Sequence, residues 1–273
     1  MPQAEPAASP PRLHSGKLQA SDWNRSLMIG PWRLYAVSVN RWRSHFATEA
    51  DLRRVFDLRE RRHLRQIRFA KRKLEWGAGR LAGKQALQRL QAELAAPQRA
   101  LRDIIISNCK TDPHQGRPEA NMEGYISISH ADDWAVAAAG RCPVGVDIEP
   151  VRTFCGSVWE MAFTPEERRW LLRRGRNERD ASATMAWAFK EALLKCYGRS
   201  IFGWFADVEL HPPGDAGALS WTLSRRLSRE LGAVANTPLV AIADRFQGCA
   251  LVVVGSPPEV CDRLQGLNAQ GIY

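Results

Sequence analysis

Long apolar runs and paired cysteine motifs are both missing from this 273-residue sequence. The longest apolar runs, such as residues 250–254, are far too short to span a bilayer, so we expect no membrane partner. The N-terminus lacks the apolar segment of a signal peptide, and we expect none. The six cysteines include no CxxC pair, and no histidine pair stands nearby at zinc-binding spacing. A structural zinc site is therefore not expected, and the scattered cysteines are typical of free thiols in a reducing cytoplasm.

Composition points to a globular protein with an anionic partner. Hydrophobic residues make up 45% of the chain, which is ordinary for a protein with a buried core. Lysine and arginine outnumber aspartate and glutamate by 39 to 29, for a formal net charge of +10. Nucleic acid, an acidic membrane surface, an acidic protein and a phosphorylated small molecule would all suit this charge, and charge alone does not choose among them.

The order of the expected elements divides the chain into two halves. Residues 1–22 are rich in proline, alanine and serine, and we expect them to form a disordered tail. Strands and helices recur on both sides of residue 142, which favours an α+β fold. We expect subdomains at residues 23–142 and 143–258, followed by an extension at 259–273.

Local signals place several elements. Thr48 followed by Asp51 predicts a helix start, and Thr164 followed by Pro165 predicts another. A further helix is expected over residues 182–197, after a charged loop at 173–180. Apolar alternation predicts strands that begin near residue 32 and that cover 104–106, 125–130, 134–139, 143–149, 207–211, 219–223, 238–243 and 249–254.

Two carboxylates lie on one face of the strand expected over residues 143–149. Because successive side chains of a strand point to opposite faces, Asp147 and Glu149 share a face, about 7 Å apart at roughly 3.3 Å per residue. Gly145 lies on that same face, where it leaves room for a ligand. Oxygen ligands of this kind favour magnesium, manganese or calcium over zinc.

A third carboxylate belongs to the helix expected over residues 182–197. Trp187, Glu191 and Lys195 recur every four residues and so share one side of it, and Lys190 lies between this side and the apolar stripe. That apolar stripe consists of Met185, Phe189, Leu193 and Cys196. Taken alone, a Glu–Lys pair at this spacing is most often a surface ion pair, and an Asp-x-Glu at a strand end is often only solvated.

Taken together, these segments resemble a known family. Residues 145–149 (Gly-Val-Asp-Ile-Glu) and 187–195 (Trp-Ala-Phe-Lys-Glu-Ala-Leu-Leu-Lys) are similar to the two signatures of 4′-phosphopantetheinyl transferases of the surfactin-synthetase-activating type. Residues 128–130 (Ile-Ser-His), preceded by 116–118 (Gly-Arg-Pro), look like the Ser-His element of that family. The resemblance extends from about Phe69 to Val208.

The resemblance implies a reaction and an architecture. Such enzymes move 4′-phosphopantetheine from coenzyme A to a serine of an apo acyl or peptidyl carrier protein, which yields holo carrier protein and adenosine 3′,5′-bisphosphate. It further implies two similar α+β subdomains, related by a pseudo-twofold axis, with coenzyme A in the cleft between them. Because two equivalent halves in one chain can form this cleft, we expect a monomer.

The resemblance also implies roles for individual residues. Asp147, Glu149 and Glu191 would bind magnesium, and the candidate base is Glu191 or a metal-bound water that it orients. Lys195 would lie beside the diphosphate, where it could stabilise the departing phosphate. A glutamate that is both ligand and base is awkward, because binding a metal makes it less basic. The residues expected to contact coenzyme A are His63, Arg80, Arg117, Ser129, His130, Lys190 and Lys195, with His130 near the 3′-phosphate. Among the early basic residues, Lys71 and Lys84 are alternatives to His63 and Arg80.

Other functions fit part of the pattern. Carboxylates and a lysine beside a basic surface would also suit a metal-dependent nuclease, and a basic nucleic-acid-binding module is a third alternative. A dense basic stretch could be a solvated helix face or a landing surface for an acidic carrier protein. This stretch consists of Arg53, Arg54, Arg59, Arg61, Arg62, Arg65, Arg68, Lys71, Arg72 and Lys73. Carrier proteins of fatty-acid, polyketide and nonribosomal-peptide synthesis all fit the resemblance.

Overall fold

The computed structural model describes most of the chain between residues 24 and 260. The described residues are 24–29 (backbone only), 32–111, 114–200, 203–212, 220–257 and 259–260. The expected tail at 1–22 and nearly all of the expected extension at 259–273 therefore lie outside them. None of the helices within these ranges is both long and apolar enough to cross a membrane.

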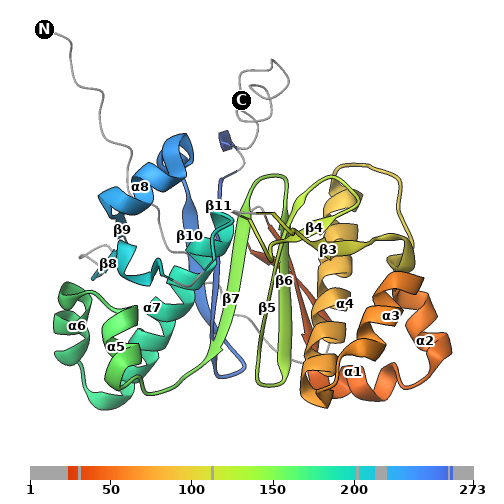
Figure 1. The fold of residues 1–273 in the computed structure, drawn as a ribbon, viewed down its shortest axis with the longest axis horizontal. Helices are drawn as coiled ribbons and strands as arrows, with labels where there is room; N and C mark the ends of the chain where they lie inside the picture. The colour runs from red at the N-terminus through yellow and green to blue at the C-terminus, as the bar shows by residue number, and fades with distance from the viewer. Residues whose placement is uncertain are drawn as a thin grey trace, which may run out of the picture.

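Helices and strands are mixed throughout, as the α+β prediction requires (Figure 1). The elements before residue 142 are β1 (Asn24–Ile29), β2 (Trp32–Ser38), α1 (Val39–His45), α2 (Glu49–Val55), α3 (Leu58–Gln66), α4 (Ala70–Glu93), the short 3₁₀ helix η1 (Leu101–Asp103), β3 (Ile106–Asn108), β4 (Pro118–Ala120), β5 (Tyr125–Ala131) and β6 (Trp134–Gly140). Those after it are β7 (Val144–Pro150), α5 (Gly156–Ala162), α6 (Pro165–Leu172), α7 (Arg176–Cys196), η2 (Phe205–Asp207), β8 (Val208–His211), β9 (Ser220–Leu223), α8 (Arg225–Leu231), η3 (Gly232–Asn236), β10 (Val240–Phe246) and β11 (Cys249–Gly255).

Two antiparallel sheets form the centre of the molecule. The first has the order β1-β2-β6-β5 and the second the order β10-β11-β7. Strands β5 and β7 lie side by side where the sheets meet (Figure 1), and the backbone N–H of Val146 donates to Ser127 Oγ across this junction at 3.0 Å. The junction therefore brings the Ser-His segment of β5 next to the acidic segment of β7.

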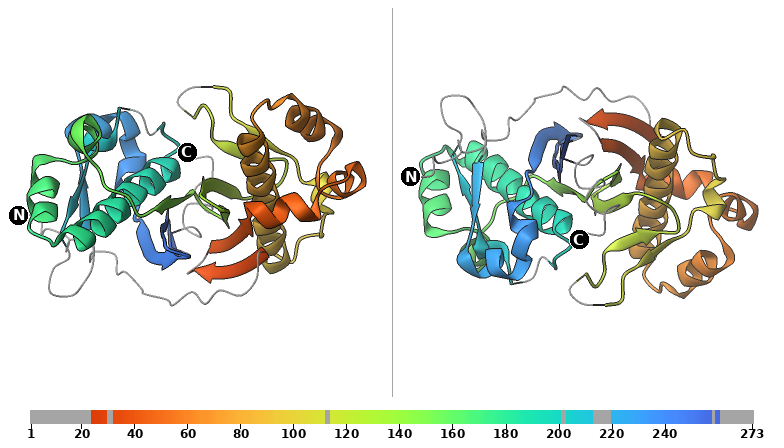
Figure 2. Two further views of the ribbon diagram at one scale, coloured as in Figure 1. Left: turned by 90° about the horizontal axis from the view of Figure 1, so that it is seen from below. Right: turned by 90° about the horizontal axis from the view of Figure 1, so that it is seen from above.

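Three clusters of apolar side chains fill the spaces between the two sheets and between each sheet and its helix. Helix α4 packs on one face of the first sheet, and α7 packs on one face of the second. The two remaining faces pack against each other through side chains such as Leu34, Val136, Val146 and Ile148. The order helix, sheet, sheet, helix is also visible end-on, with α4 and α7 on opposite outer sides (Figure 2).

Several boundaries differ from the predictions. The helix starts at Thr48 and Thr164 are confirmed, because each side chain accepts a hydrogen bond from the third residue of its helix. Strand β1 was not expected, and the strand expected at 104–106 is β3, which begins at Ile106. The loop expected at 173–180 is wrong in its second half, since α7 already begins at Arg176. Residues 176–180 form the first turn of α7 and are largely exposed, so they carry polar and charged side chains. They therefore lack the apolar periodicity by which a helix is recognised in a sequence.

A completely buried lysine fixes the long helix of the first half. Lys84 of α4 donates to Glu60 Oε2 at 2.5 Å and to the carbonyls of Val55 and Leu101 at 2.7 and 3.1 Å. Glu60 also caps the start of α3 together with Asp57. One ammonium group therefore joins α4 to the end of α2, the start of α3 and η1.

Helix α7 repeats this arrangement in the second half. The buried Lys190 donates to Glu167 Oε2 at 2.6 Å and to the carbonyls of Ala162 and Phe205 at 2.8 and 3.1 Å. Glu167 caps the start of α6 together with Thr164. The partners again come from the end of one helix (α5), the start of the next (α6) and a short 3₁₀ helix (η2).

Removing either lysine should destabilise the chain strongly, because a buried carboxylate would lose its partner. We expect Lys190→Met and Lys84→Met each to lower the free energy of unfolding by about 3–5 kcal/mol. The double variant Lys190→Met/Glu167→Gln also removes the unpaired negative charge of Glu167, so its free energy of unfolding should fall by less. Urea unfolding of the variants measures these differences, and a loss below about 1 kcal/mol in the single variants would contradict this account.

Candidate metal and anion-binding site

The structure brings the three expected carboxylates together. Asp147 and Glu149 of β7 and Glu191 of α7 each offer an oxygen within 4.8 Å of the others. The expected alternation holds, because Val146 and Ile148 of the same strand point into the core between the sheets. Three oxygen donors from two elements can therefore converge on one point.

Gly145 has a different role from the one expected. A Cβ at this position would lie 1.8 Å from the carbonyl oxygen of Ala192 in α7. The missing side chain thus allows the helix to approach β7, and α7 fills the space that we had assigned to a ligand. This close approach places Glu191 opposite Asp147.

Asp147 is the most deeply buried of the three acids. Its side chain is 1% exposed, and its Oδ1 accepts hydrogen bonds from Ser129 Oγ at 2.7 Å and from Lys195 Nζ at 2.6 Å. Its Oδ2 is buried and has no hydrogen-bond partner among the described residues. A buried carboxylate oxygen without a partner is costly, and a cation would satisfy it.

Burial and mutual repulsion perturb the acids. Burial, reinforced by the charge of Asp147, raises the pKa of Glu191 to about 7. Burial and the same neighbour also raise the pKa of Glu149. For Lys195, burial lowers the pKa, but the charges of Asp147 and Glu191 outweigh it and the net direction is upward. Lys195 and the half-exposed Arg152 are two cations beside three carboxylates, and the remaining negative charge fits a hard divalent cation such as Mg²⁺.

A cavity lined by a buried arginine lies beside these acids on the side of α4. It has a volume of about 200 Å³, and Arg80, Ser129 and His130 are among its lining residues. Arg80 is 8% exposed and donates to Asn108 Oδ1 at 2.7 Å, whereas its Nε has no partner in the described part of the chain. A buried guanidinium with an unused donor, next to a histidine, is suited to bind an anion.

A second cavity, of about 250 Å³, continues along the junction. Arg117 and Lys195 line it together with His114 and Arg199. Of the residues expected to contact coenzyme A, Arg80 and His130 therefore share the first cavity, and Arg117 and Lys195 share the second. Ser129 lines the first cavity, but its hydroxyl donates to Asp147.

Two of the expected coenzyme A contacts are not at the site. Lys190 is completely buried, and its three hydrogen bonds go to α5, α6 and η2. The prediction that it contacts coenzyme A is therefore wrong. Its neighbour Glu191 faces β7 because successive helix residues point about 100° apart. His63 packs against Trp76, with ring centroids 5.1 Å apart, and does not line either cavity.

Other neighbours of the site were missed from the sequence. Asn108 holds Arg80, Glu75 lies 3.4 Å from His130, and Arg152 lies 3.7 Å from Glu149. The first two contacts join segments 28 and 55 residues apart, and no local spacing announces them. Arg152 stands three residues after Glu149, a spacing that could have suggested the pair.

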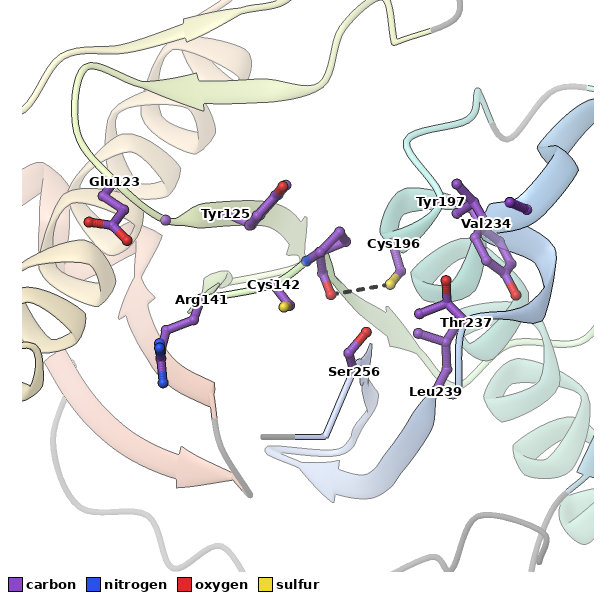
Figure 3. A pocket seen from close by; sticks show the side chains of 13 residues that line it. Glu123, Tyr125, Arg141, Cys142, Cys196, Tyr197, Val234, Thr237, Leu239 and Ser256 are labelled. Carbon is purple, nitrogen blue, oxygen red and sulfur yellow. Dashed lines mark hydrogen bonds between the residues drawn. The ribbon is translucent and has the colours of Figure 1, made fainter. Parts of the chain in front are cut away.

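A larger cavity lies at the other end of β5 and β7 (Figure 3). It has a volume of about 370 Å³, and its lining includes Tyr125, Cys142, Cys196 and Leu239. Cys196 Sγ donates to the carbonyl of Pro143 at 3.4 Å, as the dashed line in Figure 3 shows. Because this lining is largely apolar and includes none of the three carboxylates, we do not place the reaction there.

Comparison with known proteins addresses the same part of the chain. Residues 143–236 match the family model described as the 4′-phosphopantetheinyl transferase superfamily. These residues contain β7 and α7 with the three carboxylates. The suspected family resemblance is confirmed here.

Curated relatives are similar to a segment of this chain of 77 to 87 residues. The 4′-phosphopantetheinyl transferase gsp of Aneurinibacillus migulanus is 31% identical over 87 residues, which are 32% of this chain and 37% of gsp. The transferase psf-1 of Bacillus pumilus is 32% identical over 77 residues, 28% of this chain and 33% of psf-1. The transferase Sfp of Bacillus subtilis is 25% identical over 79 residues, 29% of this chain and 35% of Sfp. The chain thus spans about a third of the length of the curated relatives it matches.

Solved structures give a weaker likeness. The complex of an ACPS with CoA from Chronobacterium ammoniagenes is 24% identical, with a TM-score of 0.34, and covers 41% of this chain and 93% of that one. A holo-(acyl-carrier-protein) synthase of Bacillus anthracis in complex with CoA (3′,5′-ADP) is 23% identical, with a TM-score of 0.32, and covers 41% and 96%. At these TM-scores the likeness does not define the fold.

The raised pKa of Glu191 predicts how stability depends on pH without metal. The usual pKa of 4.5 becomes about 7 in the folded chain, so folding favours the protonated form. The contribution of Glu191 to the free energy of unfolding should therefore be largest near and below pH 4.5 and fall, by up to about 3 kcal/mol, as the pH rises to 7. Urea unfolding at pH 5 and 7.5 in a chelating buffer measures the change, and Glu191→Gln should flatten it. Stability that rises over this range, or an equal fall in the variant, would contradict the prediction.

Proposed function

We propose that the chain transfers 4′-phosphopantetheine from coenzyme A to a serine of an apo acyl or peptidyl carrier protein. The products are holo carrier protein and adenosine 3′,5′-bisphosphate. The observation that carries the proposal is the group of three carboxylates, two of them buried, with Lys195 beside them, within the residues that match the transferase family. The names of the relatives and the cationic cavities along the junction support it.

The proposed metal ligands are Asp147, Glu149 and Glu191. Their oxygens suit Mg²⁺, and the unpartnered Oδ2 of Asp147 is a donor that such an ion would use. When bound, the ion would neutralise charge on the diphosphate, which otherwise repels a nucleophile.

The remaining roles belong to side chains of the two cavities. Arg80 and His130 are proposed to bind the nucleotide phosphate, and Arg117 and Lys195 the diphosphate. The carrier serine oxygen forms a bond to the phosphorus next to pantetheine, while the bond from that phosphorus to the bridging oxygen breaks. The serine proton passes to a carboxylate oxygen of Glu191, and the leaving phosphate faces Lys195, whose charge stabilises it.

We also propose the finer architecture expected from the sequence. The buried lysines Lys84 and Lys190 have equivalent partners in the two halves, which supports subdomains at 23–142 and 143–258 related by a pseudo-twofold axis. The tail at 1–22 and the extension at 259–273 complete the proposed division. A cytoplasmic monomer that binds coenzyme A and an acidic carrier protein, without nucleic acid or membrane, is the working form.

A transfer assay tests the proposed activity. The full chain is incubated with coenzyme A, MgCl₂ and apo carrier proteins of the fatty-acid, polyketide and nonribosomal classes, and intact mass reports addition of phosphopantetheine. We expect addition to at least one carrier, and a loss of about 100-fold or more in Asp147→Ala, which removes a proposed ligand.

The matched control is Asp103→Ala, which removes an aspartate whose side chain is 60% exposed and which lies away from the site. This variant should retain transfer, and circular dichroism should show that both variants fold. No addition to any carrier would refute the proposed function. Retained transfer in Asp147→Ala would remove Asp147 from the metal site.

A further inference from the structure

An acidic side chain lines the cavity that is otherwise suited to an anion. Glu75 of α4 is 17% exposed, and its Oε2 lies 3.4 Å from Nε2 of His130 on β5. Both residues line the cavity of about 200 Å³ that also contains Arg80. A carboxylate in such a place would repel a phosphate, so its presence requires a reason.

Neutralising Arg80 is not that reason. Among the described residues, the hydrogen bond of Arg80 goes to Asn108, and no ion pair joins it to Glu75. Pairing with Lys71 is a second candidate, because Lys71 Nζ lies 3.7 Å from Glu75 Oε1 one helical turn away. Lys71 is 83% exposed, however, and an exposed pair at this spacing contributes only a few tenths of a kcal/mol on other helices. The imidazole of His130 is the partner that shares the cavity.

A carboxylate on one ring nitrogen determines what the other nitrogen does. A carboxylate close to one ring nitrogen favours the ring orientation and tautomer that place a proton between them, which leaves the second nitrogen for another partner. His130 is half exposed and follows Ser129, whose own hydroxyl is held by Asp147. Glu75 is therefore the side chain that can hold the His130 ring in one orientation toward the cavity.

We propose that Glu75 is a positioning residue that orients His130 to bind the phosphate on the ribose of the nucleotide. The inference rests on the proposed function, since it takes adenosine 3′,5′-bisphosphate as the product. Glu75 does not touch the reacting atoms in this account. It acts through His130, so its loss should weaken binding only of nucleotides that carry a 3′-phosphate.

Calorimetric titration of the full chain with adenosine 3′,5′-bisphosphate and with adenosine 5′-monophosphate, both in MgCl₂, tests this. We expect Glu75→Gln to weaken binding of the bisphosphate about tenfold and that of the monophosphate less than twofold. Glu75→Asp keeps the charge but shortens the reach, and should give an intermediate loss. The charge control is Glu123→Gln, an exposed acid that lines the cavity of Figure 3, which should change the two affinities equally.

A double-variant cycle separates positioning from a general effect of charge. In the His130→Gln background, the further change Glu75→Gln should cost nothing more, because the residue that it positions is gone. Equal or tighter binding of the bisphosphate by Glu75→Gln, or additive losses in the double variant, would overturn the inference and leave the proposed function intact. If the wild-type chain does not bind the bisphosphate, both the role of Glu75 and the proposed nucleotide site are wrong. The transfer assay then tests the proposed function separately.

Discussion

The ion pair between Asp147 and Lys195 lies at the junction where the two halves of the molecule meet. Asp147 belongs to β7, Lys195 to α7, and the hydroxyl that completes the contact is that of Ser129 on β5 in the other sheet. Because Asp147 is buried, water does not screen its charge. Lys195 and Arg152 are two cations beside the three carboxylates Asp147, Glu149 and Glu191, so negative charge remains in excess at the junction and a bound cation would balance it.

The frame around this contact is held by groups that do no chemistry. Gly145 lets α7 approach β7, and Lys190 fixes α7 to α5, α6 and η2. Lys190 and Glu191 are adjacent, yet Lys190 anchors α7 to its neighbouring helices and Glu191 faces the carboxylates of β7. Because α7 is anchored in this way, Glu191 stays close to Asp147 and Glu149 although the three charges repel one another. The repulsion and the burial raise the pKa of Glu191 and of Glu149.

Local patterns predicted much of this arrangement. Strand alternation placed Asp147 and Glu149 together, and four-residue spacing placed Glu191 on the same side of its helix as Lys195. Spacing could not show that Lys195 belongs to the site and Lys190 does not. The partner of the buried Lys190 is Glu167, which lies 23 residues earlier in the chain. Likewise, the approach of Ala192 to Gly145 and of Glu75 to His130 depends on how distant elements pack, which leaves no trace in local periodicity.

The central claim is that the excess negative charge of Asp147, Glu149 and Glu191 is the binding site of a divalent cation. Anomalous diffraction from crystals of the full chain soaked in MnCl₂ tests it most directly, because manganese replaces magnesium at oxygen sites and scatters anomalously. The account predicts an anomalous peak between the three carboxylates, within about 2.0–2.4 Å of at least two of them. Crystals that show manganese elsewhere, or three carboxylates bridged only by Lys195 and water, would contradict it.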